Sequence, residues 1–158
     1  MNFYKFLSDL RKINSRNLYH GRIVLYILYL EKISFIKFPF KVLRRLVIQH
    51  GYLSEISPDS FISSDNIVSL RLPHPFLIII HRTASIGLNC TIFHNVTIGV
   101  IENASYESIA GKIGDNVYIG CDSAVLGNVM IGNSVRIGAK SLILKDVSSN
   151  QTVVGLYK

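Results

Sequence analysis

The sequence predicts a mainly β protein, a parallel β-helix of hexapeptide repeats preceded by an α-helical region. Six uninterrupted hexapeptides occupy residues 113–148 and read IGDNVY, IGCDSA, VLGNVM, IGNSVR, IGAKSL and ILKDVS. Each opens on an aliphatic residue, at Ile113, Ile119, Val125, Ile131, Ile137 and Ile143. A period of six fits neither an amphipathic helix nor an alternating strand, and it is typical of a hexapeptide β-helix.

A third observation concerns the residue four positions after each aliphatic one, which is small or β-branched. These residues are Val117, Ser123, Val129, Val135, Ser141 and Val147. Three hexapeptides make a coil of roughly 18 residues, in which aliphatic side chains stack on their equivalents in the next coil. The repeats suffice for four to five coils, and several must cooperate because one coil cannot bury its apolar face alone.

Charge is concentrated in the N-terminal third of the 158-residue chain. Residues 1–50 hold ten Lys and Arg against Asp9 and Glu31, a net charge of +8, whereas the remaining 108 residues hold seven basic and eight acidic side chains, net −1. We interpret the basic region as a solvated face. The alternative is peripheral contact with an anionic membrane surface, because aromatic residues are interleaved with the charges. Nucleic-acid binding is not expected, because no recognition motif accompanies the charge.

Three helices are expected before the repeats, over residues 2–13, 18–32 and 39–51. They define a basic helical region, residues 1–52, followed by a β-helical domain, residues 53–158. The apolar run 23–30 is too short to span a membrane and lacks a cleavage site, so a cytoplasmic location is expected, with the inner membrane face as the place of any lipid contact. Cys90 and Cys121 have no metal-ligand spacing, and we predict buried thiols and no metal.

The six-residue rhythm begins irregularly with Ile56, Ile62 and Val68 in phase, and it becomes firm at Ile80, Ile86, Ile92 and Ile98. Fifteen residues then separate Ile98 from Ile113, where twelve or eighteen would keep the register. The mismatch predicts a loop that leaves the coil within about 100–112. Loops that project from a rigid scaffold commonly carry functional residues.

These repeats, the loop and the ending Leu144-Lys145-Asp146-Val147 resemble the hexapeptide-repeat acyltransferases, and among them serine acetyltransferase. The resemblance spans about residues 55–155. It implies a left-handed β-helix, a homotrimer, acetyl-CoA as the donor, and active sites in clefts between subunits.

The resemblance also suggests which residues catalyse the reaction. The stretch LRLPHPFLIIIHRTASIGLNCTIFHNVTIG aligns without a gap to the family pattern and places His74 on the catalytic histidine. His94, inside IFHNVT, is the alternative base. Either imidazole, neutral near pH 7, would take the proton of an acceptor hydroxyl as that hydroxyl attacks the thioester. Glu55 occupies the place of the family's orienting acid.

For the donor, matching the family pattern implicates Cys121, Ala139 and Lys145, and Lys140 replaces a usual glycine. Small side chains let the pantetheine chain approach the backbone, and a lysine can meet a phosphate as a point charge. The alternative is that these residues do not contact the donor. Cys121 and Ala139 would then be ordinary stacking residues of the coil, and Lys145 a solvated residue at a corner.

Two departures from the family pattern concern the acceptor. The second family histidine is absent from the segment Ala110-Gly111-Lys112-Ile113, and Pro73 replaces the Asp before the catalytic histidine. Because both changes remove polar groups that would handle an amino acid, we expect a sugar hydroxyl of a surface polysaccharide or its precursor as the acceptor.

Three alternatives stay open at this point. The first is serine as the acceptor, and the second is a β-helix that binds or assembles without catalysis. The third is a related hexapeptide enzyme such as a γ-type carbonic anhydrase, which needs histidines at metal-binding geometry; His74, His81 and His94 keep it open.

Overall fold

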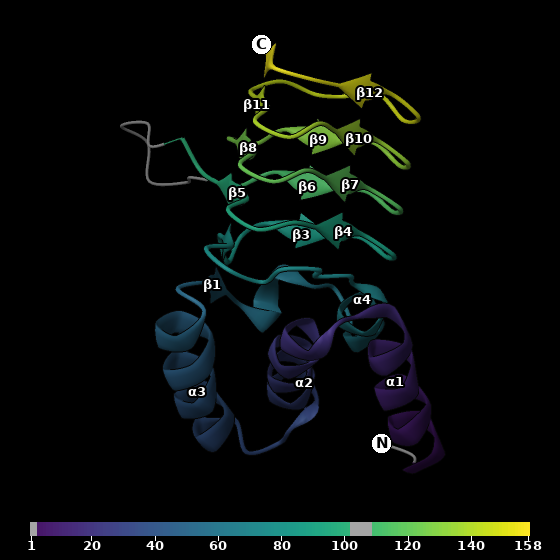
Figure 1. Cartoon of the computed structure of the whole chain (residues 1–158), viewed down its shortest axis with the longest axis vertical. Helices are drawn as coiled ribbons and strands as arrows, with labels where there is room; N and C mark the ends of the chain where they lie inside the picture. The colour runs from purple at the N-terminus through teal and green to yellow at the C-terminus, as the bar shows by residue number, and fades with distance from the viewer. Residues whose placement is uncertain (1–2, 102–108) are drawn as a thin grey trace.

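A stack of short parallel strands forms the body of the protein, and helices close its N-terminal end (Figure 1). The computed structural model describes residues 3–101 and 109–158. Its thirteen strands fall into three parallel sheets, one for each side of the coil. The predicted combination of parallel β coils with N-terminal helices is therefore confirmed.

The six-stranded sheet runs from the helical end to the C-terminus and contains β1 (Glu55–Ile56), β2 (Ile79–Ile80), β5 (Thr97–Gly99), β8 (Ala124–Leu126), β11 (Leu142–Ile143) and β13 (Leu156–Tyr157). The four-stranded sheet contains β4 (Thr91–Ile92), β7 (Tyr118–Ile119), β10 (Arg136–Ile137) and β12 (Thr152–Val153). The three-stranded sheet contains β3 (Ser85–Ile86), β6 (Lys112–Ile113) and β9 (Met130–Ile131). From β2 to β10, each coil contributes one strand to each sheet in turn.

The strand register follows the aliphatic residues of the hexapeptides. Ile80 pairs with Ile98, Ile98 with Val125, and Val125 with Ile143, and all four side chains are almost fully buried. Equivalent ladders form on the other two sheets. The core is thus a column of stacked aliphatic side chains along the coil axis, as the period of six predicts.

One coil is longer than the others, between β5 and β6. Ile80 and Ile98 are 18 residues apart, whereas the next paired step, from Ile98 to Val125, takes 27. The nine additional residues fall where the sequence predicts a loop. The centre of that predicted loop, residues 102–108, lies outside the described residues, and β6 resumes the coil at Lys112.

The first coil departs from the expected phase. Ile62 is 77% exposed, whereas its neighbour Phe61 is buried and pairs with Ile86. Val68 is buried in the helix α4 (Ser64–Ser69), which a capping box at Ser63 begins. The predicted strand phase at Ile62 and Val68 is wrong, because a capped helix is inserted between single parallel bridges at Phe61 and Arg71.

The N-terminal helices pack below this first coil (Figure 1). They are α1 (Phe3–Arg16), α2 (Tyr19–Ile33) and α3 (Phe38–Arg44), and α3 continues as a π-helical turn, Arg45–Gly51. Asn17 fastens them to the coil, since its amide accepts from Leu72 N at 2.7 Å and donates to Leu70 O at 3.0 Å. Among the described residues, no helix has the length and apolar content needed to span a membrane.

Candidate active site

His74 stands on a short loop that Ser54 anchors to the coil. The Ser54 hydroxyl donates to Pro75 O at 3.0 Å and accepts from Ile78 N at 2.9 Å, so it pins the loop just after the histidine. Pro73 and Pro75 are buried, while the imidazole between them is exposed. The two prolines restrict the backbone on either side of His74 and present its side chain to solvent.

Aromatic residues from the helical region brace the same loop. Phe76 packs against Tyr52 and His20, with ring centroids 5.2 and 5.7 Å apart, and His20 Nδ1 lies 3.1 Å from the Tyr52 hydroxyl. Burial raises the pKa of Tyr52 above its usual value. Leu77 has a φ of 57°, a left-handed conformation uncommon for leucine, and its N donates to Tyr52 O. Such strain persists only where the surroundings fix the backbone.

The structure brings both predicted bases together. The rings of His74 and His94 meet edge to face, with centroids 5.9 Å apart and an interplanar angle of 71°. His94 is half-buried, and its Nδ1 is buried without a hydrogen-bond partner among the described residues. An exposed imidazole next to a partly desolvated one is a suitable arrangement for proton transfer to and from a bound hydroxyl.

Glu55, the predicted orienting acid, lies in β1 with its side chain exposed and its backbone paired to Ile79. Within residues 3–101 and 109–158, no hydrogen bond or ion pair joins its carboxylate to His74 or His94. The anchored loop positions His74 without it. Glu55 as an orienting group stays a prediction.

Two of the predicted donor residues share one corner of the coil with His94. His94, Cys121 and Ala139 hold the third position of the hexapeptides IFHNVT, IGCDSA and IGAKSL, which stack on one another. Lys140 N donates to Cys121 O at 2.9 Å, so Lys140 lies at this corner as well. Lys145 lies just after β11, at the coil corner on the other side of the six-stranded sheet from His94. Its Nζ lies 4.8 Å from the centre of the Tyr157 ring.

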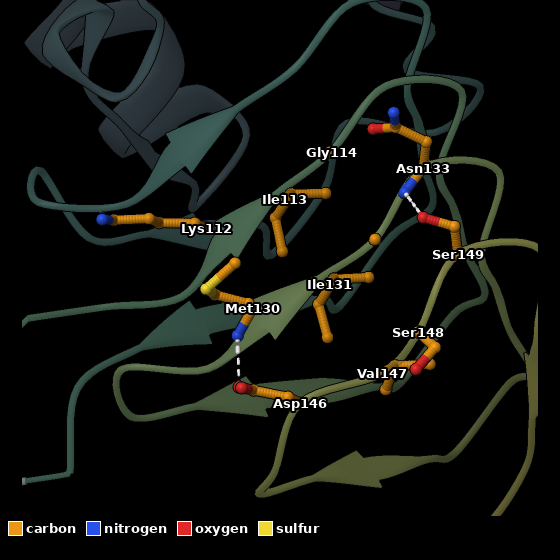
Figure 2. Close-up of a pocket in the computed structure, with 11 residues that line it drawn as sticks. Lys112, Ile113, Gly114, Met130, Ile131, Asn133, Asp146, Val147, Ser148 and Ser149 are labelled. Atoms are coloured by element: carbon orange, nitrogen blue, oxygen red, sulfur yellow. Dashed lines mark hydrogen bonds between the residues drawn. The ribbon is translucent and has the colours of Figure 1, made fainter.

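A pocket that the repeat pattern does not predict lies on the three-stranded sheet (Figure 2). It has a volume of about 560 Å³, and strand β9 runs through it between Lys112 and the segment 146–149. Asp146 accepts from Met130 N at 2.7 Å, which fixes one wall. None of its lining residues is a histidine, so the two predicted bases, His74 and His94, lie outside this pocket.

The two thiols differ in environment, and we expect them to differ in reactivity. Cys90 is fully buried, and burial raises the pKa of its thiol to about 11, so it stays protonated at neutral pH. Cys121 is half-exposed. Because the thiolate is the reactive form, iodoacetamide at neutral pH should modify Cys121 while Cys90 reacts only on unfolding. Peptide mass spectrometry after timed labelling measures this, and equal labelling of both thiols would contradict the structure.

Comparisons with known proteins agree with the hexapeptide repeats and the fold described above. Residues 111–145 match the model of the bacterial transferase hexapeptide family (six repeats). The chain is 40% identical over 85 residues to a serine acetyltransferase of Synechococcus elongatus, covering 54% of this chain and 34% of that protein. It is 37% identical over 110 residues to the mitochondrial serine acetyltransferase 3 of Arabidopsis thaliana, covering 70% of this chain and 28% of that protein. The chain thus spans about a third of these relatives.

Solved structures extend the likeness to the helical region. Soybean serine acetyltransferase complexed with serine superposes with a TM-score of 0.73 over 93% of this chain and 64% of that one, at 26% identity. The serine acetyltransferase of Neisseria gonorrhoeae in complex with serine gives a TM-score of 0.51 and 40% identity, over 55% of this chain and 35% of that one.

These findings correct the predicted acceptor. The expectation of a sugar hydroxyl and of a role in polysaccharide biosynthesis is wrong, because the relatives found by sequence and by structure are named serine acetyltransferases. No comparison supports a glycan acceptor or a membrane contact. The predicted resemblance of this chain to the hexapeptide-repeat acyltransferases, and among them to the serine acetyltransferases, is confirmed.

Proposed function

We propose that the chain is an acetyl-CoA-dependent serine O-acetyltransferase that works as a homotrimer of left-handed β-helices. The observation that carries the proposal is the exposed imidazole of His74, held on an anchored loop beside His94. The relatives named above support serine as the acceptor. In this proposal residues 53–158 carry the bases and the donor corner, while residues 1–52 line part of the acceptor pocket and brace the loop of His74 through His20.

The reaction needs one base and one site for the developing negative charge. Neutral His74 takes the proton of the serine hydroxyl while that oxygen attacks the thioester carbonyl. The carbon–sulfur bond then breaks, and CoA leaves as a thiolate that regains the proton from the imidazolium. The products are O-acetylserine and CoA, and His94 contacts the base from the adjacent coil.

The donor fits the corner that carries Cys121 and Ala139. Gly120 keeps this corner narrow, since a Cβ there would lie 2.6 Å from Ala139 N, and the small residues leave backbone accessible to a thin acyl chain. Lys140 is exposed beside it and Lys145 across the six-stranded sheet. We propose that these lysines bind the CoA phosphates, with the adjacent subunit completing the cleft.

The acceptor site uses Arg71 in place of the missing family groups. A pocket of about 330 Å³ beside Pro73, the residue before His74, contains three guanidinium groups. Arg16 donates to Asn89 and Arg22 to Asn17 O, whereas the exposed Arg71 side chain makes no hydrogen bond with a described residue. Arg71 is therefore available for a bidentate bond to the carboxylate of serine.

Replacing Arg71 by glutamine is expected to raise the KM for serine about tenfold or more, because a charge-assisted hydrogen bond is lost. The KM for acetyl-CoA should stay unchanged, since none of the residues that line this pocket belongs to the donor corner. The matched control is Arg82→Gln, which removes another exposed arginine. Steady-state kinetics with each substrate varied separately measures the effect, and an unchanged KM for serine would remove Arg71 from the site.

The whole proposal is tested by thiol release from acetyl-CoA in the presence of serine, other amino acids and a panel of sugars. We expect CoA release with serine and no comparable rate with sugars. Mass spectrometry of the product should show one acetyl group on the serine oxygen. Absence of turnover with serine, together with absence of acetyl-CoA binding by calorimetry, would contradict the proposal.

A further inference from the structure

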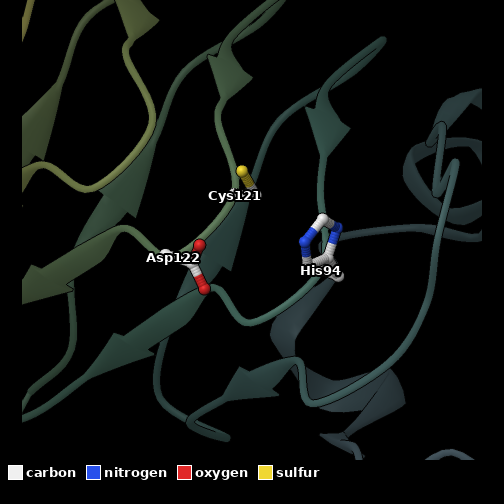
Figure 3. A group of neighbouring side chains, drawn as sticks. All are labelled: His94, Cys121 and Asp122. Carbon is white, nitrogen blue, oxygen red and sulfur yellow. The ribbon is translucent and has the colours of Figure 1, made fainter.

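A second group of side chains with metal-ligand chemistry gathers at the corner of His94. One candidate ligand atom from each of His94, Cys121 and Asp122 lies within 4.8 Å of the others (Figure 3). His94 comes from one coil, and Cys121 and Asp122 come from the next. Parallel strands lie about 4.8 Å apart, so the coil register itself places these side chains within reach of one another.

No hydrogen bond through Nδ1 to a described residue fixes the His94 ring. Its Nδ1 is the one buried side-chain nitrogen or oxygen among the described residues that has no hydrogen-bond partner. A buried polar atom left unsatisfied costs about 1–3 kcal/mol. The ring is therefore not tied through Nδ1 to another described side chain, and one of its nitrogens is among the candidate ligand atoms at the corner.

Asp122 is held in a way typical of ligating carboxylates. Asn95 Nδ2 donates to its Oδ1 at 2.6 Å, and no described residue bonds its Oδ2. Asn95 and Asp122 occupy equivalent turn positions with φ of 54° and 60°, and Asp122 N donates to His94 O. Partners outside the metal shell commonly orient a ligand in this manner.

We infer that His94, Cys121 and Asp122 bind a divalent transition metal, Zn²⁺ in particular, with one coordination position left open. Imidazole, thiolate and carboxylate are the three ligand types that Zn²⁺ takes. At metal–ligand distances of about 2.0–2.3 Å, tetrahedral donors lie about 3.5 Å apart. The half-exposed Cys121 and exposed Asp122 have room to close this difference by side-chain rotation. Binding displaces the thiol proton of Cys121 to solvent.

This inference goes beyond the proposed acetyl transfer, although Cys121 also lies at the corner given to the donor and His94 contacts the base. Its test measures metal binding, so its failure can be told apart from failure of the proposed acetyl transfer. It also reverses the sequence-based expectation of no metal. His94 and Cys121 are 27 residues apart, and only the coil register across the extended β5–β6 connection makes them neighbours. Cysteine spacing along the chain therefore gives no signal of the site.

The test uses the untagged chain after removal of metals by a chelator. Zn²⁺ is titrated in competition with a chromophoric chelator, and Co²⁺ is added separately to record its absorption spectrum. We expect one ion per chain and a thiolate-to-cobalt charge-transfer band. Cys121→Ser should abolish the band, and Cys121→Ser and His94→Gln should each weaken Zn²⁺ binding by at least about 100-fold. Asn95→Gly removes the hydrogen bond to Asp122, and glycine tolerates the positive φ at this position, so this variant should weaken Zn²⁺ binding about tenfold.

Two matched variants control the assignment. Cys90→Ala removes the other thiol, and His81→Gln removes an imidazole that lies 2.8 Å from the Thr83 hydroxyl on another corner. Both should bind Zn²⁺ as the wild type does, and circular dichroism establishes that each variant is folded. Absence of stoichiometric binding by the wild type, a cobalt band that survives Cys121→Ser, or equal losses in the control variants would each overturn the inference.

Discussion

Replacement of His74 by alanine is expected to lower kcat for serine acetylation by about 10²- to 10⁴-fold, the usual contribution of a general base. The loss should appear in kcat more than in KM, because the imidazole acts on the hydroxyl proton during attack. His74 is exposed and makes no hydrogen bond through its side chain to a described residue, so its removal should leave the fold intact. Thiol release from acetyl-CoA measures the effect.

The control for this prediction is His81→Ala, which removes an imidazole that bonds Thr83 instead of facing the site. Its kcat should match that of the wild type. His94→Gln tests the alternative base, since glutamine keeps a polar side chain at the corner. If His94→Gln abolishes turnover while His74→Ala retains it, the base is His94 and the role given to His74 is wrong.

The fold could be predicted where the repeat is regular and not where it is interrupted. From Ile80 onward, the aliphatic positions fix the strands, because a side chain that must stack on its equivalent tolerates no change of phase. In the first coil, Ser63 and Asn66 form a capping box, and this local hydrogen bonding favours a helix over the strand that periodicity alone predicts.

The candidate site could also be predicted from the sequence only in part. A pattern match identified His74 and His94, but it could not reveal that Ser54 fixes the loop or that Phe76 is braced by His20 from the helical region. These contacts join residues far apart in sequence and follow from packing. Asp122 could have been found by stacking the hexapeptides on one another, which places it on the coil above Asn95.

The stability of the coil core should depend strongly on each single stacked side chain. Ile119→Ala is expected to lower the free energy of unfolding by about 2–5 kcal/mol, the usual cost of truncating a buried isoleucine. Ile119 is fully buried and pairs with Ile92 on one side and Ile137 on the other, both also fully buried. Backbone hydrogen bonds hold these coils at a fixed spacing, so neighbouring side chains cannot move in to fill the cavity.

Urea unfolding at one fixed protein concentration measures this loss, since a trimer would make the midpoint depend on concentration. Lys112→Ala is the matched control, because Lys112 also lies on a central strand but its side chain is exposed, and its change should stay within about 0.5 kcal/mol. An unchanged slope with a lowered midpoint for Ile119→Ala would assign the effect to the cavity. Equal midpoints for the two variants would mean that the aliphatic column does not determine the stability of the coil.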